Sequence, residues 1–327
     1  MASNKGRILF LLQYLQENTD EYHAVSSTEL VELYAANGFN GNRKTVRDDI
    51  QELIAAGYDI YEEIGSGVST TYSYVGRIFD LPEIKMLIDA VSSARFISST
   101  SSKELIDKLA KLASRHTKEK LTAMVYPSDR VMTANQRLYY VIDIIQQAIH
   151  AKKKIRFQYL DYNIQKELIL HNDGEYYDFS PYCCAWNGDR YYLLGRLDKR
   201  PDGINPFRID LMCTPEILKE DAVPPPEDFN PAEYAAKVFR MFNGTDEKVT
   251  LEAENRLMKK FIDRFGEDFR SWKVSDTSFR AEVEVAVSPT FYAWVSEYSG
   301  QIRIVAPDSV RSAYIEHLEK LLSSAKK

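Results

Sequence analysis

The sequence predicts an α+β protein of several domains, because the spacing of its apolar residues changes along the chain. Helical spacing dominates the first part, apolar and polar residues alternate as in strands through the middle, and helices alternate with strands towards the end. With 327 residues, 44% of them hydrophobic, the chain is long enough for more than one ordinary domain. We predict four segments, at residues 1–78, 79–134, 135–222 and 223–327.

Three short helices are predicted in the first segment. Apolar residues at helical spacing indicate one helix from Lys5 to about Asn18. The motif Ser-x-x-Glu from Ser26 to Glu29 predicts the start of a second helix, since its hydroxyl and carboxylate satisfy unpaired backbone amides. Asn42 is a good N-cap for the third helix.

The start of the third helix is rich in basic residues, although the whole chain is acidic, with a net charge of −6. Helix–turn–helix proteins insert such a recognition helix into the major groove with its N-terminus first. Arginine and lysine there contact guanine edges or phosphates, and glutamine contacts adenine. Asp48 and Asp49 are expected to reduce the positive charge of this helix. The candidate DNA-binding residues are Arg43, Lys44, Thr45, Arg47 and Gln51.

A hairpin is predicted after the three helices. Two strand-like runs, Asp59–Ile64 and Val68–Tyr74, flank the turn Gly65–Gly67. Helices and hairpin together predict a winged helix-turn-helix DNA-binding domain over residues 1–78. Glu62 on the hairpin would repel phosphate, so we expect the wing to add little affinity for DNA. One alternative stays open, a small helical adaptor in which the basic residues form a solvated face.

Residues 79–134 are predicted to form a helical connector. Asp80 and Pro82 mark the start of one helix, and Ser98–Ser102 is expected to interrupt the pattern before a further apolar stripe begins. No group of side chains in this segment is suited to chemistry. The connector is therefore expected to serve dimerisation or spacing, or simply to pack.

The third segment changes from helices to strands. A helix is predicted to end near Lys152, and apolar and polar residues then alternate from Lys154 to Tyr159 as in a half-buried strand. Asn172–Gly174 and Asn187–Gly188 supply residues that tolerate positive φ, and they predict turns between further strands. Short strands joined by such turns favour a small barrel.

This third segment resembles the WYL domain of bacterial transcriptional regulators. The resemblance rests on the motifs Ser180–Tyr182, Asn187–Leu193 and Pro206–Asp210. Tyr191 stands where the family has tryptophan, and Leu211 stands where it usually has a second arginine.

The resemblance implies an Sm-like or SH3-like five-stranded barrel in residues 135–222 that senses a ligand, taken to be nucleic acid in several members. Basic residues interleaved with aromatic ones suit phosphate contact and base stacking, so we expect a nucleic-acid or other anionic effector. The candidate effector-binding residues are Arg208, which matches the family's Phe-Arg-x-Asp motif, then Arg190 and Arg196, together with Tyr182 and Tyr192. In the alternative, the aromatic residues are core, the arginines are surface, and Asp210 is the structural partner of Arg208.

The last segment opens with a proline-rich linker, Ala222–Pro231. Strand and helix patterns then alternate three times, which predicts an α/β sandwich with helices on one face of a small sheet. Phe291–Trp294 and Gln301–Pro307 resemble the tail of the WCX domain, the extension that often follows a WYL domain. Residues 223–327 are therefore expected to be WCX-like, and the resemblance then covers nearly the whole chain in the same domain order.

The sequence predicts neither catalytic residues nor a metal or cofactor site. The five histidines are scattered, and no glycine-rich phosphate loop is present. Cys183 and Cys184 could be imagined as a metal or thiol site with His171, but inert cysteine on a strand is favoured. The three cysteines do not form a disulfide framework, and no apolar run approaches the ~20 residues of a membrane helix. We expect a cytoplasmic protein without a membrane partner.

These patterns predict a ligand-responsive transcriptional regulator. Its winged helix would bind duplex DNA, its middle barrel would sense the effector, and two-fold operators would require a homodimer. The alternative is an adaptor that binds single-stranded nucleic acid through the barrel, with no control of a promoter.

Overall fold

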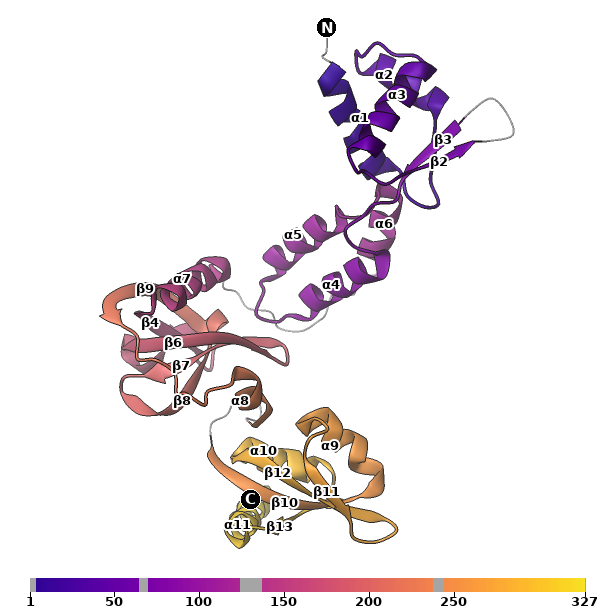
Figure 1. The fold of residues 1–327 in the computed structure, drawn as a ribbon. Helices are drawn as coiled ribbons and strands as arrows, with labels where there is room; N and C mark the ends of the chain where they lie inside the picture. The colour runs from indigo at the N-terminus through magenta and orange to yellow at the C-terminus, as the bar shows by residue number, and fades with distance from the viewer. Residues whose placement is uncertain (1–3, 65–69, 124–136, 238–243, 327) are drawn as a thin grey trace. The chain divides into compact units, whose positions relative to one another are not determined.

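The computed structural model describes residues 4–64, 70–123, 137–237 and 244–326 (Figure 1). The chain divides into two compact units, residues 1–134 and 135–327. Antiparallel sheets of three, six and four strands alternate with helices, which confirms the predicted mixture of helix and sheet. The predicted turn at Gly65–Gly67 lies outside the described residues.

The first unit begins with three helices and a three-stranded antiparallel sheet in the order β1-β3-β2. Ser26 and Glu29 form the predicted capping box of α2, and the Asn42 side chain accepts a hydrogen bond from the backbone N–H of Thr45 at the start of α3. Both predicted helix starts are thus confirmed. The elements are α1 (Asn4–Asn18), β1 (Val25–Ser26), α2 (Ser27–Ala36), α3 (Arg43–Ala55), β2 (Ile60–Ile64) and β3 (Thr70–Tyr74).

A buried carboxylate fixes α3 to the two preceding helices. Asp49 is only 4% exposed. The Arg7 guanidinium of α1 donates to it twice, at 2.7 and 2.9 Å, and the Tyr34 hydroxyl of α2 donates to it at 2.9 Å. The sequence had led us to expect that Asp49 reduces the exposed positive charge of α3. That expectation is wrong for Asp49, because its carboxylate is buried and paired. It orients that helix instead.

Three connector helices follow, α4 (Leu81–Ser93), α5 (Ser99–Ala110) and α6 (Arg115–Ala123). The expectation that Ser98–Ser102 interrupts a helix is wrong. The Ser98 side chain accepts a hydrogen bond from the backbone N–H of Ser101, so this run begins α5, and the break lies just before it. A serine at an N-cap satisfies a helix terminus, which explains why a serine-rich stretch starts a helix here.

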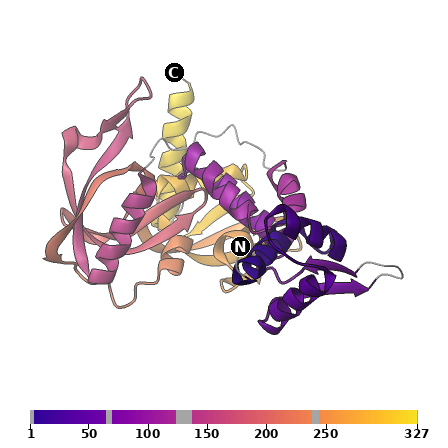
Figure 2. The ribbon, with the colours of Figure 1, turned by 90° about the horizontal axis from the view of Figure 1, so that it is seen from above.

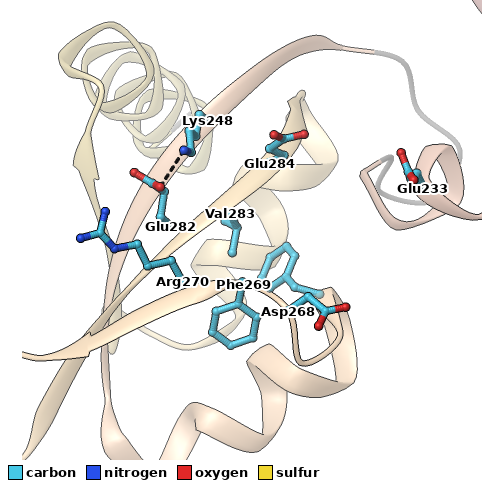
Figure 3. A pocket seen from close by; sticks show the side chains of 9 residues that line it. Glu233, Lys248, Asp268, Phe269, Arg270, Glu282, Val283 and Glu284 are labelled. Atoms are coloured by element: carbon cyan, nitrogen blue, oxygen red, sulfur yellow. Dashed lines mark ion pairs between the residues drawn. The ribbon is translucent and has the colours of Figure 1, made fainter. Parts of the chain in front are cut away.

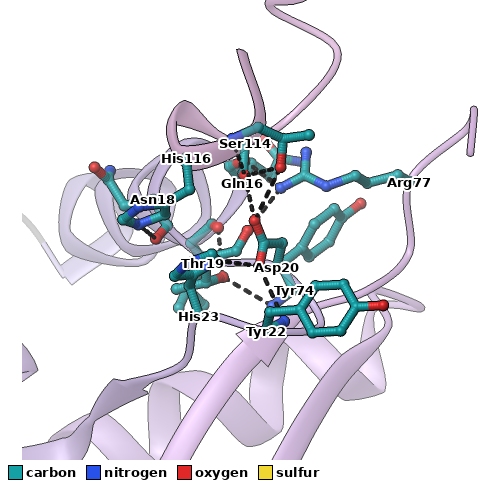
Figure 4. A network of polar contacts seen from close by, with 12 residues as sticks. Gln16, Asn18, Thr19, Asp20, Tyr22, His23, Tyr74, Arg77, Ser114 and His116 are labelled. Carbon is teal, nitrogen blue, oxygen red and sulfur yellow. Dashed lines mark hydrogen bonds and ion pairs between the residues drawn. The ribbon is translucent and has the colours of Figure 1, made fainter. Parts of the chain in front are cut away.

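A buried carboxylate also joins the connector to the preceding helices, within the first unit (Figure 4). Asp20 Oδ1 accepts a hydrogen bond from the backbone N–H of Tyr22 at 3.0 Å and lies 2.7 Å from His23 Nδ1. Asp20 Oδ2 accepts hydrogen bonds from the Thr117 hydroxyl at 3.2 Å and from the Ser114 hydroxyl. Four partners from both sides of the junction therefore converge on one carboxylate.

Arg77 reinforces the same junction from the strand side. Its guanidinium donates to the backbone carbonyls of Gln16 at 2.8 Å, Thr19 at 2.7 Å and Leu112 at 3.3 Å. Unsatisfied carbonyls at the ends of α1 and α5 are thus paired by a single side chain.

Replacement of Asp20 by asparagine is expected to destabilise the first unit in a pH-dependent way. Burial acts to raise the pKa of Asp20, but its hydrogen bonds, first that of Ser114, outweigh burial and hold the pKa well below the ordinary 3.8. A depressed pKa contributes stability above the ordinary value that is lost as the pH falls below it. The variant should lose about 2 kcal/mol near pH 7. Urea unfolding of the full chain at several pH values measures this difference, which should shrink below about pH 4.

The exposed neighbour Glu21, changed to glutamine, is the matched control for the loss of one carboxylate and should unfold as the wild type does. An Asp20→Asn chain as stable as the wild type at neutral pH would contradict the anchoring role of Asp20.

The second unit begins with α7 (Leu138–Ala151), which lies against β4 and β9 of a six-stranded sheet (Figure 1). The strand order is β5-β4-β6-β7-β8, and β9 pairs with the other side of β4. The predicted positive φ is present at Asn172, Asp173 and Gly188. The remaining elements are β4 (Lys153–Tyr162), β5 (Leu168–Leu170), η1 (His171–Gly174), β6 (Tyr176–Asn187), β7 (Arg190–Leu197), β8 (Arg200–Arg208), η2 (Ile209–Leu211) and β9 (Met212–Asp221).

Aromatic rings fill the interior of this sheet. Phe207 packs edge-on against Phe157, Tyr159 and Phe179, with ring centroids 5.1, 5.2 and 5.4 Å away. Phe157 and Phe179 are fully buried. These rings therefore form the aromatic core of the sheet, whereas Trp186, one of its other aromatic residues, is 52% exposed.

The prediction of a linker at Ala222–Pro231 is wrong at its last residue, because Pro231 begins a short helix, α8 (Pro231–Lys237). The prediction relied on the prolines of this segment, but proline is also well suited to the first turn of a helix. The preceding residues pack on the sheet, since the Val223 backbone N–H donates to the Ser180 hydroxyl at 3.0 Å and Phe229 packs on Tyr182.

The C-terminal domain is a four-stranded antiparallel sheet in the order β11-β12-β10-β13. Side chains from α9, α10 and α11 share one core with alternate strand residues, so these helices cover the same face. The short edge strand β11 had no clear signal in the sequence. The elements are β10 (Thr245–Glu254), η4 (Asn255–Leu257), α9 (Met258–Phe265), β11 (Arg270–Lys273), β12 (Ser278–Val287), α10 (Pro289–Glu297), β13 (Ile302–Ala306) and α11 (Asp308–Ala325).

Candidate functional site

The first candidate surface is the N-terminal half of α3. Arg43, Lys44 and Arg47 are all exposed there, and Arg43 donates to the Thr28 hydroxyl of α2 at 3.0 Å. The helix N-terminus adds a partial positive charge to this surface. Three cations therefore project from a helix that the Asp49 contacts hold in place.

The other two predicted DNA-binding residues are engaged within the first unit. The Thr45 hydroxyl and backbone N–H both lie within hydrogen-bonding distance of Asn42 Oδ1, at 3.3 and 3.0 Å. The Gln51 amide donates to Glu62 of β2 at 3.3 Å. Thr45 is thus held by the Asn42 cap, and Gln51 faces the hairpin.

The second candidate surface lies where β7 and β8 meet η2. Asp210 has a side chain that is 1% exposed, and two arginines converge on it. Arg208 donates through Nε and a terminal nitrogen, at 3.1 and 2.7 Å, and Arg190 donates at 3.2 Å. Tyr192 is the cross-strand neighbour of Arg208, so three of the five predicted effector-binding residues are brought together.

The charged groups of this set, the Asp210 cluster, are two guanidinium groups and two carboxylates. Arg208 and Arg190 share the buried Asp210 carboxylate, and Arg190 Nε also lies 3.9 Å from the more exposed Asp189. Burial lowers the pKa of Arg208, but the hydrogen bond and the charge of Asp210 outweigh burial and raise the pKa overall. Burial raises the pKa of Tyr192, while the two arginines oppose that effect. The cluster therefore holds two permanent cations and a neutral phenol around one buried carboxylate, with a second carboxylate at its edge.

Tyr159 belongs to the same group, although it was not among the five candidate effector-binding residues. Its hydroxyl accepts a hydrogen bond from the backbone N–H of Arg208 at 3.2 Å. Burial is the main cause that raises the pKa of Tyr159. The strand alternation around Tyr159 placed it in the core, but its reach to β8 depends on strand pairing that sequence periodicity does not reveal.

The remaining two predicted residues, Tyr182 and Arg196, form a second group. Arg196 pairs with Ser180 across β6 and β7, and its Nε is buried with no hydrogen-bond partner among the described residues. The Tyr182 hydroxyl donates to the Pro224 carbonyl at 3.4 Å. Alternation along β7 places Arg196 on the same side as Tyr192, so the two groups lie along one strand face.

The imagined cysteine site has no support. Burial raises the pKa of Cys184 to about 11, so this thiol stays protonated at neutral pH. Burial also raises the pKa of Cys183. His171 is paired with the Tyr177 hydroxyl at 2.7 Å. Among the described residues, no three histidine, cysteine or acidic side chains are grouped as metal ligands would be.

A cavity of about 460 Å³ lies at the edge of the C-terminal sheet (Figure 3). Apolar side chains line part of it, and its charged lining consists of four carboxylates and two cations, from Glu233, Asp268, Glu282, Glu284, Lys248 and Arg270. Acidic side chains outnumber basic ones in this lining, and their negative charge repels an anion. The cavity therefore does not suit the expected class of effector. Within the described ranges, no helix has the length and apolar composition of a membrane span.

Comparison with known families agrees with this domain order. The model of the WYL domain matches residues 140–217, and the model of the WCX domain matches residues 245–322. No curated protein matches the chain at a significant level.

Two solved structures are similar to parts of the chain at low identity. Proteasome accessory factor B/C (PafBC) of Arthrobacter aurescens is 18% identical, with a TM-score of 0.31 over 95% of this chain. This chain spans only 47% of that protein. A CRISPR Cas-related protein is 11% identical, with a TM-score of 0.36 over 77% of this chain and 75% of that one. The two domain matches give the assignment: the chain contains a WYL domain at residues 140–217, followed by a WCX domain at residues 245–322.

Proposed function

We propose that the chain is a DNA-binding transcriptional regulator that responds to an anionic effector. In this proposal residues 1–78 are a winged helix that binds duplex DNA and residues 79–134 are its connector. Residues 135–222 are the ligand-sensing WYL domain, and residues 223–327 are the WCX-like domain. The regulator acts as a homodimer, because two-fold operators present paired half-sites.

The observation that carries the DNA-binding part is the exposed basic start of α3. Arg43, Lys44 and Arg47 are exposed on a helix whose inner face is fixed through Asp49. A rigid helix with cations at its N-terminal end suits insertion into a major groove. Strands β2 and β3 pair beside this helix and supply the wing.

The effector part rests on the Asp210 cluster. We infer an Sm-like or SH3-like barrel from β4, β6, β7, β8 and β9, because β9 returns to pair with β4 and η2 joins β8 to β9. Arg190 and Arg208 share the buried Asp210 carboxylate and their side chains stay 20% and 29% exposed, so an anion would find two guanidinium donors there. Tyr192 offers a ring beside them for a base or another planar group.

Fluorescence anisotropy tests the proposal. The purified chain is titrated against duplex DNA from its own upstream region, with unrelated duplex and single strands as competitors, over a salt series. We expect selective binding to the upstream duplex. The logarithm of the association constant should fall linearly with the logarithm of the salt concentration, with a slope of about −0.9 for each phosphate contact. Binding to single strands alone would contradict the regulator and support the adaptor that holds single-stranded nucleic acid.

A further inference from the structure

Gln51 lies between the basic surface of α3 and the wing. It follows Arg47 by one helical turn, and residues four apart share one face of a helix. Strand β2 lies against α3 in both ribbon views (Figure 1, Figure 2). The Gln51 amide nitrogen donates to Glu62 Oε2 of that strand at 3.3 Å, while the residue as a whole is exposed. Gln51 therefore contacts the wing strand without being covered by it.

Glu62 is fixed close to the same surface. It pairs across the hairpin with Tyr72 of β3, which is 2% exposed. Burial is the main cause that raises the pKa of Tyr72, the negative charge of Glu62 raises it further, and the positive charge of Arg47 opposes both. A carboxylate from the wing and a guanidinium from α3 therefore both lie near one buried ring.

The charge of Glu62 determines which way the Gln51 amide is turned. An ionised carboxylate only accepts hydrogen bonds, so the amide nitrogen and not the amide oxygen faces Glu62. The amide has two N–H groups, and the contact at 3.3 Å uses one of them. The amide oxygen and the other N–H remain for a further partner.

An adenine base matches what remains of the amide. In the major groove, adenine presents the acceptor N7 beside the donor N6–H, and a glutamine amide binds both at once through its N–H and its oxygen. An amide that is free to turn loses rotational freedom when it binds, whereas the Glu62 contact has already restricted the Gln51 amide. Gln51 is thus oriented for adenine before DNA binds.

The charge of Glu62 has a second effect that does not depend on base sequence. A negative charge beside the basic surface of α3 repels phosphate, and phosphate contacts supply most of the non-specific affinity for DNA. Orientation of Gln51 and repulsion of phosphate are therefore separable consequences of one side chain. The first acts at one base pair, and the second acts on every sequence.

We propose that Glu62 is a positioning residue for base readout, which holds the Gln51 amide in the orientation that binds adenine. The inference deepens the proposed function and rests on it, because α3 must enter the major groove. It names the base that this side chain reads in each half-site. It also places the determinant of that readout on the wing strand, outside the recognition helix.

Duplexes that contain 7-deazaadenine test the contact with adenine. This base still pairs with thymine but carries a C–H group in place of the N7 acceptor. Each adenine of the bound upstream duplex is replaced in turn, and anisotropy gives the affinity of the full chain. The wild type should bind roughly fivefold to tenfold more weakly at one adenine of each half-site, because one hydrogen bond is lost. Gln51→Ala should bind the substituted and the unmodified duplex equally.

Two replacements of Glu62 separate its reach from its charge. Glu62→Asp keeps the charge but is one methylene shorter, so the contact with Gln51 is lost. This variant should no longer respond to 7-deazaadenine, and its affinity for unrelated duplex should equal that of the wild type. Glu62→Gln keeps the reach and an acceptor oxygen but loses the charge. It should still respond to 7-deazaadenine, and it should bind unrelated duplex roughly twofold more tightly at low salt.

Glu63→Gln is the matched control, because Glu63 is exposed on the same strand and its side chain points to the opposite face. It should behave as the wild type in both measurements, and circular dichroism should show an unchanged fold in every variant. Selective duplex binding that responds to no 7-deazaadenine, or a Glu62→Asp chain that responds as the wild type does, would overturn the role of Glu62 and leave DNA binding by α3 intact. A wild type with no selective duplex binding would overturn both that role and the proposed function.

Discussion

Simultaneous replacement of Arg43, Lys44 and Arg47 by alanine is expected to abolish selective binding to duplex DNA. Each base contact by an arginine or lysine contributes about 1–3 kcal/mol, so three contacts together account for a loss of at least about 100-fold. The fold of the first unit should be unchanged, because all three side chains are exposed and the tie between α3 and its neighbours runs through Asp49. Anisotropy at several salt concentrations measures the loss and the change in slope.

The matched control removes the same number of positive charges from the connector. Lys103, Lys108 and Lys111 are exposed on or beside α5, and their triple alanine variant has the same net charge as the first. We expect it to bind duplex DNA almost as the wild type does, since long-range attraction is screened at about 10 Å in 0.1 M salt. Equal losses in both variants would mean that overall charge, not the α3 surface, holds the DNA. Undiminished binding by the variant that lacks Arg43, Lys44 and Arg47 would mean that α3 does not contact DNA.

Local signals predicted helix starts and turns well, because the physics of a cap or turn involves residues close in sequence. Asn42 begins α3, and Ser26 with Glu29 begins α2, as expected. The positive φ at Gly188 likewise follows from the residue itself. The error at Ser98 arose from the same principle, since a serine that ends one pattern caps the next helix.

Contacts between residues that are far apart in the chain could not be predicted from sequence patterns. Asp49 looked like a surface acid on a basic helix, because nothing local shows that Arg7 and Tyr34 meet it across the domain. The distinction between a buried tie and an exposed charge is set by tertiary packing, which helical periodicity alone does not resolve. Asp20 and its partners at positions 114 and 117 are a second such case.

The candidate effector site shows the same division. Residue type and the family motif pointed to Arg208, Arg190 and Tyr192, and the strand register does bring these three together. Tyr182 on β6 and Arg196 on β7 form a separate group, because the sequence showed which residues were basic or aromatic but not which strands are neighbours.

Removal of Asp210 is expected to be among the most damaging single changes in the WYL domain. In Asp210→Ala two guanidinium groups, with side chains 20% and 29% exposed, would face each other across an unfilled site. Loss of one partner from a buried ion pair costs about 3–5 kcal/mol, because the remaining charge is left uncompensated. Urea unfolding of the full chain should show an early transition of the second unit. Asp210→Asn, which keeps the shape and one acceptor, should lose less.

Asp178 provides the control, because it pairs with Arg156 on the same sheet through two short hydrogen bonds of 2.6 and 2.8 Å. Those side chains are 39% and 32% exposed, so water screens the pair and replaces its contacts when Asp178 is changed to alanine. The two variants remove the same chemical group from the same domain and differ in burial. Equal stability losses would show that Asp210 is a surface pair like Asp178. A much larger loss for Asp210→Ala than for Asp178→Ala would show that burial makes Asp210 the structural anchor of its cluster.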